Sequence, residues 1–314
     1  MVGRERLAPL WSLGLVAVAL GAPFAIESSY WQGVMAAIAI WSIAAVSLAQ
    51  AVNWMMRLSL MTPALMGLGA YAAAIAQVEH GWSFLPAAGI AALAAMVCAA
   101  LVGLVAFRSS HWGFSIITFA ANLILVNLSI SLDDITHGPG GYAGIPPVQL
   151  FGRSLESGRS LYFLALAILA IQLCALWAWR RSVAGRSARI VGEDPQLAQA
   201  LGIPCYSLQV CVFAALAAPV GIAGALYGSF RGVVSPELLG FTRIVDILAM
   251  VMIGGTKLLF GPILGAIAVT SLPEWLRFLG PSRDGVFGLV LILIVVLAAP
   301  RWRWRVSTLM GARS

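Results

Sequence analysis

The sequence predicts an all-α integral membrane protein with about ten transmembrane helices. Hydrophobic residues make up 61% of the 314 positions and charged residues only 10%, and the mean hydropathy is +0.94. Soluble domains are typically about 45–50% apolar and about 25% charged. The apolar residues also form runs close to the roughly 20 residues that cross a bilayer. We therefore expect residues 1–314 to form a single transmembrane domain.

Ten apolar runs are the predicted spans. In chain order they are 7–26, 33–53, 58–77, 84–107, 112–130, 161–179, 207–229, 241–253, 259–276 and 285–300. The first follows Arg4 and Arg6 as in a signal peptide, but it exceeds the roughly 7–15 residues of a signal-peptide apolar core, so we expect an uncleaved span. Two later runs are candidates for half-helices, because 241–253 has only 13 residues and 259–276 is rich in glycine and proline.

The basic residues predict the orientation of these spans. With the N-terminus inside, the inner connections carry 13 of the 19 Lys and Arg residues and the outer ones carry six. Cytoplasmic loops are enriched in these residues, so both termini are expected to be cytoplasmic. The net charge of +7 comes from small groups at the ends of apolar runs, which argues against nucleic-acid binding.

The spans lack the residues that chemistry in a membrane would need. There is no phosphate-binding GxxxxGK[ST] loop and no HExxH or His/Cys cluster, and His80, His111 and His137 lie away from the middle of any span. We expect no catalytic, cofactor-binding or metal-binding residue and no enzyme activity. A proton-coupled secondary carrier would need ionisable residues at mid-depth, and only Asp246 is a candidate.

Small residues in the spans have two interpretations. Membrane helices use glycine to bring backbones close together, and tight packing is the simpler explanation for each one. The alternative applies to Gly254, Gly255 and Gly261, which with Pro262 can break a helix beside a transport pathway.

Polar residues in the spans are expected to have structural partners. Hydrogen bonds between helices are the expected role of Gln50, Asn122 and Asn127. Arg243 and Asp246 are spaced i, i+3 at the end of a span, which favours an ion pair. Asp246, being deeper, is kept as a pathway or gating candidate.

Residues 131–160 form the longest predicted outer segment. Its glycines and prolines, including Gly140 and Gly141, cannot continue a helix and favour compact turns. A long ordered loop is often functional, so Gly140 and Gly141 are pathway or gating candidates and the segment is either a plug, a docking surface or a connector.

The loop 180–206 is the most informative stretch of the chain. Asp194 is a good N-cap, Pro195 suits the first helical position, and Gly202 suits a left-handed turn after the last one. These signals predict a helix from Pro195 to Leu201. Two turns are not stable alone in water. We therefore expect Leu197 and Leu201, with Ala198 beside them, to dock on a partner rather than on the chain's own bundle.

The residues of this loop and the stretches after it resemble a known family. EDPQLAQALGI, from Glu193 to Ile203, resembles the coupling-helix motif of ABC importer permeases. SPELL, IVDILAMVMIGG and GPILGA, between Ser235 and Ala266, are similar to the C-terminal half of branched-chain amino acid permeases of the LivM type. LSL with GLGAY and GPGGYAGIP add to the resemblance, which covers roughly residues 34–300 in register.

This resemblance implies a subunit of an ATP-driven importer in the bacterial cytoplasmic (inner) membrane. The implied partners are two cytoplasmic ATPase subunits, a second homologous permease and an extracytoplasmic solute-binding protein. The ATPase-coupling residues would be Glu193, Asp194, Leu197, Ala198, Leu201 and Gly202. A branched-chain amino acid is the implied solute. The departure from the family pattern around Arg57 to Pro63 keeps urea and short-chain amides open as alternatives, beside a secondary carrier.

Overall fold

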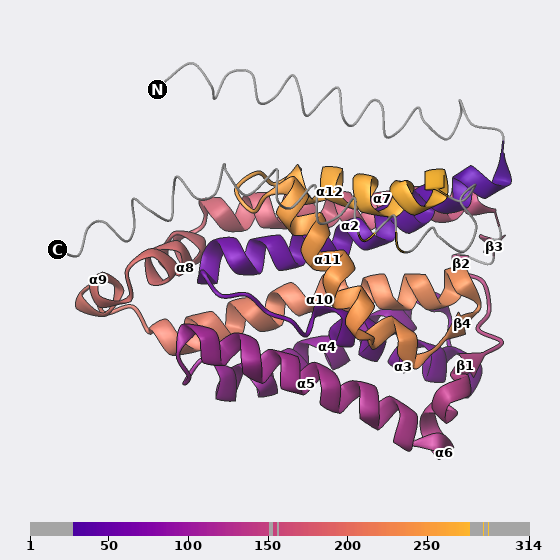
Figure 1. Cartoon of the computed structure of the whole chain (residues 1–314), viewed down its shortest axis with the longest axis horizontal. Coiled ribbons are helices and arrows are strands. Elements are labelled where there is room, and N and C mark those ends of the chain that lie inside the picture. Colours follow the sequence, from indigo (N-terminus) through magenta and orange to yellow (C-terminus); the bar gives the residue numbers. More distant parts are fainter. Residues whose placement is uncertain (1–27, 151–152, 156, 277–284, 286–287, 289–314) are drawn as a thin grey trace.

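The computed structural model describes residues 28–150, 153–155, 157–276, 285 and 288, which form a bundle of long helices (Figure 1). The predicted span 7–26, and all but two residues of 285–300, lie outside this part of the chain. The long helices are α2 (Ser29–Met55), α3 (Thr62–Val78), α4 (Phe84–Ala106), α5 (His111–Ser131), α7 (Gly158–Arg181) and α10 (Cys205–Arg231). The shorter segments are α6 (Asp133–Thr136), η1 (Gly138–Gly140), α8 (Val183–Glu193), α9 (Pro195–Ala200), η2 (Pro236–Leu239), α11 (Phe241–Gly254) and α12 (Gly261–Trp275).

Five of these helices are long and apolar enough to cross a membrane, namely α2, α4, α5, α7 and α10. The others that match predicted spans are shorter: α3 has 17 residues, α11 has 14 and α12 has 15. At about 1.5 Å per residue they reach roughly 21–26 Å, less than the roughly 30 Å of the hydrocarbon layer. The half-helix expectation for 241–276 therefore agrees with the lengths of α11 and α12, while the total of about ten spans stays a prediction.

Local signals set the ends of the helices. The hydroxyl of Ser110 accepts a hydrogen bond from Gly113 N and begins α5, and that of Ser157 accepts one from Ser160 N and begins α7. Left-handed residues end two others, since Met56 (φ 52°) follows α2 and Gly232 (φ 69°) follows α10. Such caps satisfy the free backbone groups at helix ends.

Helix α10 lies at the centre of the bundle, between α3 and α4 on one side and α2 on the other (Figure 1). Glycines allow this close packing. A Cβ atom on Gly69 would lie 2.5 Å from the backbone of Gly221, and one on Gly224 would lie 1.9 Å from the carbonyl oxygen of Met66. The packing role predicted for these small residues is confirmed, because only glycine lets the backbones of α3 and α10 meet.

Helices α11 and α12 form a tight hairpin that packs on α2. A Cβ atom on Gly254 would lie 2.0 Å from the carbonyl oxygen of Gly261, and one on Gly265 would lie 1.8 Å from that of Met250. The turn between the helices begins at Gly255, whose φ is 76°. The close packing of α11 on α12 therefore explains why glycine occupies positions 254 and 261.

Short strands close one end of the bundle. β1 (Tyr142–Ala143) pairs antiparallel with β4 (Val233–Val234), and β2 (Gln149–Leu150) pairs antiparallel with β3 (Arg153–Ser154). The first pair ties the turn-rich segment after α5 to the end of α10. We call this the β1 end of the bundle, and the opposite end, where α8 and α9 lie, the α9 end (Figure 1).

Two non-helical segments run into the interior of the bundle, and we call them the two interruptions. Residues 56–61 follow α2 from the α9 end, so α3 begins inside the bundle at Thr62 and not at residue 58 as predicted. The segment 235–240, which contains η2, runs from the β1 end to the middle of α5, where Leu239 accepts a hydrogen bond from Asn122. Irregular backbone at membrane depth is tolerated only where protein or water satisfies it.

Three polar side chains form a row on α5, which we call the α5 polar stripe: Ser115, Thr118 and Asn122. They make hydrogen bonds to backbone groups in both interruptions. Ser115 Oγ donates to the carbonyl oxygen of Leu58 at 2.8 Å. Thr118 Oγ1 accepts from Leu60 N at 3.1 Å, and Asn122 Nδ2 donates to the carbonyl oxygen of Leu239 at 3.0 Å. At spacings of three and four residues the three side chains share one face of α5. One helix therefore holds the starts of both α3 and α11.

The predicted hydrogen bonds between helices are only partly confirmed. Asn122 bonds to another element, and Gln50 Oε1 accepts from Arg180 Nη2 of α7 at 2.6 Å. For Asn127 the prediction is wrong, because its Nδ2 donates to Leu123 O in its own helix at 2.8 Å. Asn127 is exposed and Asn122 is fully buried, so only Asn122 needs a partner from elsewhere.

Asn122→Leu should destabilise the bundle, whereas Asn127→Leu should not. The first change leaves the buried carbonyl of Leu239 without its partner, which costs about 1–2 kcal/mol. The second removes only a bond within one helix. The midpoint of thermal aggregation of the purified protein in lipid nanodiscs would measure both variants. Equal midpoints would contradict the role assigned to the α5 polar stripe.

Candidate functional site

The α9 end carries the predicted coupling helix. Asp194 Oδ1 accepts hydrogen bonds from Gln196 N and Leu197 N, each at 3.0 Å, and Pro195 occupies the first position of α9. Gly202, with φ 74°, follows the helix, and Ile203 N donates to Ala198 O at 3.0 Å. The helix is confirmed within one residue of its predicted end, and Asp194 and Gly202 perform the predicted capping roles.

The apolar side chains at α9 are of two kinds, one buried and two exposed. Ala198 is fully buried, which holds α9 to the rest of the chain, while Leu197 is 50% exposed and Leu201 is 61% exposed. A six-residue helix cannot be stable through its own hydrogen bonds. The two leucines thus form an apolar projection at the tip of an otherwise anchored loop.

The sequence predicted a single short helix in the 180–206 loop, and this was wrong, because α8 precedes α9. Ser182 Oγ accepts from Gly185 N at 3.0 Å and begins α8. Glu193 belongs to the last turn of α8, where it pairs with Arg189 at 3.2 Å. The glycines at 185 and 192 obscured the helix in the sequence, because glycine is a poor helix former.

Those same glycines fasten α8 to the bundle. A Cβ atom on Gly185 would lie 2.0 Å from the carbonyl oxygen of Trp179 in α7, and one on Gly192 would lie 2.2 Å from that of Trp54 in α2. The indole rings of Trp54 and Trp179 lie 6.2 Å apart. Helix α8 is therefore packed closely against the ends of α2 and α7. It connects α9 to α2, the helix that precedes the first interruption.

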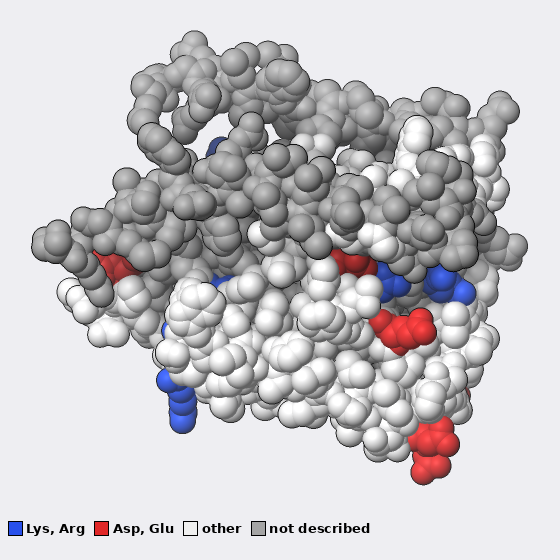
Figure 2. Space-filling model, viewed as in Figure 1, with Lys and Arg blue, Asp and Glu red and all other residues white. Residues whose placement is uncertain are grey.

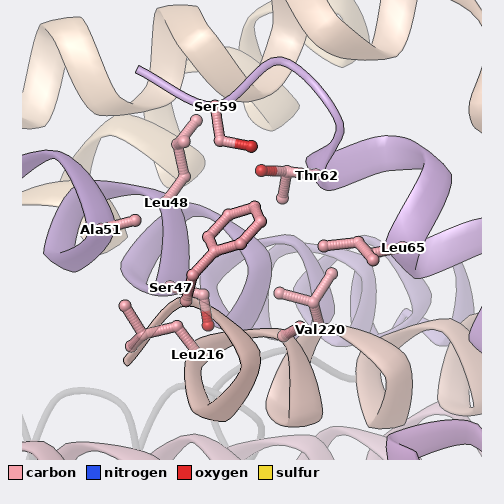
Figure 3. A pocket seen from close by; sticks show the side chains of 10 residues that line it. Ser47, Leu48, Ala51, Ser59, Thr62, Leu65, Leu216 and Val220 are labelled. Atoms are coloured by element: carbon pink, nitrogen blue, oxygen red, sulfur yellow. The ribbon is translucent and has the colours of Figure 1, made fainter. Parts of the chain in front are cut away.

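A small cavity lies beside that interruption, among α2, α3 and α10 (Figure 3). Its lining is mostly apolar, with three buried hydroxyls from Ser47, Ser59 and Thr62. The hydroxyl groups of Ser59 and Thr62 face each other at one side of it (Figure 3). Three hydroxyl groups therefore line an otherwise apolar space at the start of α3.

At the β1 end, Gly141 occupies a position that only glycine fits. Its φ is 71°, and a Cβ atom would lie 2.2 Å from the carbonyl oxygen of Val234 in β4. The neighbouring Gly140 has open space around it and no left-handed backbone. Gly141 and Gly144, whose φ is 78°, both have a left-handed backbone that favours glycine, which agrees with the compact turns predicted for residues 131–160.

Tyr142 anchors the same turn. Its hydroxyl donates to Glu79 Oε1 at 2.6 Å, and its ring lies 4.5 Å from that of His137. Burial, followed by the hydrogen bond and the negative charge of Glu79, raises the pKa of Tyr142 to about 12. The hydroxyl therefore stays protonated and keeps this bond over the physiological pH range.

Charged residues also lie at mid-depth, around the first turn of α11. Arg243 Nη1 donates to Asp246 Oδ2 at 3.0 Å, so the predicted ion pair is confirmed. The guanidinium carbon of Arg243 lies 5.4 Å from the ring of Trp41, at the middle of α2. The pair lies at the end of its span, as predicted, and this end of α11 begins beside Leu239, level with Asn122 in the middle of α5.

The predicted site residues thus fall into separate groups. The coupling residues Glu193 to Gly202 lie together at the α9 end, and Gly140 and Gly141 lie at the β1 end. Gly254 and Gly261 contact each other, while Asp246 lies two turns earlier in α11.

Ser115 and Thr118 were not predicted as functional residues, although their spacing with Asn122 on an apolar helix is visible in the sequence. Among the described residues, no three His, Cys, Asp or Glu side chains are placed to hold a metal ion.

Known proteins give this arrangement a context. LivM of Escherichia coli K12, a high-affinity branched-chain amino acid transport permease, is 28% identical over 257 residues, or 73% of this chain and 59% of LivM. The fructose import permease FrcC of Rhizobium meliloti is 26% identical, over 61% of this chain and 54% of FrcC. LivH of E. coli K12 is 25% identical, over 65% of this chain and 73% of LivH.

The chain spans about three fifths of the length of LivM. No solved structure matches it. The family described as the branched-chain amino acid transport system permease component matches residues 30–298. The five membrane-length helices, the capped loop at the α9 end and this match together identify a multi-pass membrane permease, and the chain belongs to the branched-chain amino acid transport permease family.

Proposed function

We propose that this chain is a permease subunit of an ATP-driven importer, and that α9 docks on a cytoplasmic ATPase. The observation that carries the proposal is the pair of exposed leucines on a short helix that is capped at both ends and anchored by Ala198. An apolar projection on an ordered aqueous loop lowers its free energy by entering a groove of a partner. ATP hydrolysis would take place in that partner, with no catalytic residue, metal or cofactor in this chain.

The clamp formed by α8 suggests how ATPase movement reaches the membrane. A force on α9 passes to α8 and, through Gly192 and Trp54, to the end of α2. The next residues, 56–61, form the first interruption, which has no helical hydrogen bonds of its own and borders a small cavity at Ser59 and Thr62. Residues 56–61 would therefore absorb the movement between a rigid loop and the rest of the bundle.

The complete importer would contain two ATPase subunits, this chain, a second homologous permease and a solute-binding protein outside. The name of LivM favours a branched-chain amino acid as the solute, whereas that of FrcC refers to fructose. Urea and short-chain amides are further alternatives. A secondary carrier is less well supported, because the carboxylate of Asp246 is already bonded to a guanidinium and so is poorly suited to carry a proton.

The importer function requires the α9 end to face the cytoplasm. Both termini would then be cytoplasmic, in the bacterial cytoplasmic membrane, as the arginine distribution predicts. Arg186 and Gly140 are exposed at opposite ends of the bundle. In a variant without native cysteines, an impermeant maleimide applied to whole cells should label Gly140→Cys and not Arg186→Cys. Labelling of Arg186→Cys in intact cells would reverse the proposed orientation.

Truncating the leucine pair should separate the permease from its ATPase. Leu197→Ala combined with Leu201→Ala would remove about 2–4 kcal/mol of buried contact, which weakens binding by roughly 30-fold or more. The variant should insert normally, lose the ATPase during purification, and lose solute-stimulated hydrolysis after reconstitution. Gly202→Pro should act similarly, because proline cannot adopt the left-handed turn.

A matched control exists on α4, where Leu93 is 60% exposed and Leu101 is 61% exposed. Leu93→Ala combined with Leu101→Ala removes the same atoms from a surface without a predicted ATPase contact, and should retain the ATPase. The docking role would be refuted by full ATPase retention in the Leu197/Leu201 variant.

Gly141→Val should impair solute uptake more than membrane insertion. The valine would meet the carbonyl oxygen of Val234 and strain the left-handed backbone that joins β1 to β4. Gly140→Val, one residue away in open space, should leave uptake unchanged. Uptake in cells, normalised to the amount of inserted protein, would compare the two, and equal uptake would make the segment a simple connector.

A further inference from the structure

Arg57, the second residue of the first interruption, is held by aromatic rings rather than by a carboxylate. Its guanidinium carbon lies 5.4 Å from the centre of the Phe107 ring and 5.7 Å from that of Phe114. Its Nη1 donates to the carbonyl oxygen of Ser109 at 3.2 Å. The ion pairs within the described residues involve other arginines. Arg57 thus joins the first interruption to the turn between α4 and α5 through a cation–π contact and one hydrogen bond.

This environment is unusual for an arginine at the α9 end. Basic side chains are visible on the surface at that end (Figure 2), where an arginine can remain hydrated. Arg108 is exposed in this way, with its guanidinium 5.6 Å from the ring of Tyr206. Arg57 is half-buried instead. Because no carboxylate binds it within the described residues, its guanidinium can return to water without leaving an unpaired buried charge behind.

The rings beside Arg57 belong to a cluster that reaches the small cavity. Phe107 and Phe114 lie 4.8 Å apart, and they lie 5.9 and 5.7 Å from the ring of Phe213 in α10. All three side chains are buried. Phe213 also lines the cavity, together with Ser59 of the first interruption. A continuous set of contacts therefore runs from Arg57 through the three rings to the cavity.

The residue before Arg57 lies against α8. Met56 has a left-handed backbone, with φ 52° and ψ 25°, which is uncommon for a residue with a large side chain. A Cβ atom on Gly192 of α8 would lie 3.5 Å from Cγ of Met56. Backbone strain of this kind persists only where the surrounding structure maintains it. A displacement of α8 would therefore reach Arg57 through one intervening residue.

The rest of the first interruption is attached in a different way. Leu58 and Leu60 are bound through their backbone groups to Ser115 and Thr118 of the α5 polar stripe. Arg57 is bound through its side chain, at the end of the segment that is nearest to α8. The backbone bonds are suited to act as a pivot, and the side-chain contacts of Arg57 are suited to break and form again.

We propose that Arg57 is a latch that keeps the first interruption closed over the cavity, and that ATP-driven movement of α8 releases it. In the closed state the guanidinium contacts Phe107 and Phe114. In the open state it returns to water at the α9 end, the rings separate from Phe213, and water enters the cavity from that end. The inference rests on the proposed importer function and assigns the residue that controls when the first interruption moves.

The competing explanation is that Arg57 only stabilises the fold. Two substitutions separate the explanations, because they act on a latch in opposite directions. Arg57→Ala removes the contacts with the rings and should leave the interruption open. Arg57→Met places an apolar side chain against the rings, and this side chain gains nothing by returning to water, so the interruption should stay closed. A purely structural role predicts that neither change alters the effect of ATP on the cavity.

The test measures access to the cavity in the assembled importer, in lipid nanodiscs and with the four native cysteines replaced. Ser59→Cys places a thiol in the cavity lining, where serine is 2% exposed. Ser42→Cys, at a fully buried position of α2 outside that lining, is the matched control. An impermeant thiosulfonate reacts with a hydrated thiolate. ATP should therefore accelerate the reaction of Ser59→Cys and leave Ser42→Cys unreactive.

The latch variants are compared in the same background. With Arg57→Ala, Ser59→Cys should react roughly tenfold faster without ATP, because the contacts with two rings are lost. Arg57→Lys keeps a cation beside the rings and should restore most of the slow rate. With Arg57→Met the slow rate should persist in ATP, and the rate of ATP hydrolysis should fall. Arg108→Ala, which removes an exposed cation–π contact from the same turn, should change none of these rates.

Three outcomes overturn the latch while the importer function stands. Equal reaction of Ser59→Cys with and without ATP, in a complex that hydrolyses ATP, would show that the interruption does not open. Acceleration of Ser59→Cys and Ser42→Cys alike by Arg57→Ala would show a general loosening of the bundle. The same effect of Arg57→Ala and Arg57→Met would leave Arg57 a structural role. Loss of the ATPase from the complex with unaltered α9 would instead refute the proposed function.

Discussion

The architecture depends on hydrogen bonds to backbone groups that lie inside the membrane without helical partners. Lipid offers no hydrogen bonds in the hydrocarbon layer, so each such group must be satisfied by protein or by water in a cavity. The α5 polar stripe does this for both interruptions, through Leu58, Leu60 and Leu239. Because one face of one helix serves both segments, the positions of α3 and α11 relative to each other are set by α5.

This constraint explains why charge can occur in the middle of the bundle. Once the segment 235–240 is held at the depth of Asn122, the first turn of α11 starts there, and Arg243 comes to lie over Trp41. The pair with Asp246 compensates part of the cost of bringing the guanidinium out of water. The short length of α11 follows from the same starting point, since a helix that begins at mid-depth needs fewer residues to reach a surface.

The two ends of the bundle are stiffened by different means. At the α9 end, glycine contacts bring α8 against the carbonyls of Trp54 and Trp179. At the β1 end, the β1–β4 pair and the bond from Tyr142 to Glu79 hold the turn against α10 and α3. Between these ends, residues 56–61 run without helical structure beside a small cavity lined by α2, α3 and α10. In the proposed importer, the clamped loop would pass a force from the ATPase to these residues.

The sequence by itself determined the features that arise within a few residues. The caps of α9 at Asp194 and Gly202 and the i, i+3 pair of Arg243 and Asp246 follow from local geometry. Hydropathy likewise located the long helices, because lipid imposes its pattern on every span. The resemblance to the permease family rested on motifs of the same kind.

Only the tertiary structure decided which groups meet across the bundle. The start of α3 at Thr62 depends on hydroxyls more than 50 positions later in the chain, and α8 depends on the ends of two other helices. The depth of Arg243 depends on Asn122, whose amide gives no sign in the sequence of the carbonyl it will bind. The packing of the helices determines these hydrogen-bond partners. A sequence pattern can therefore reveal a polar group in a membrane helix, but it cannot show which backbone group that side chain will bind.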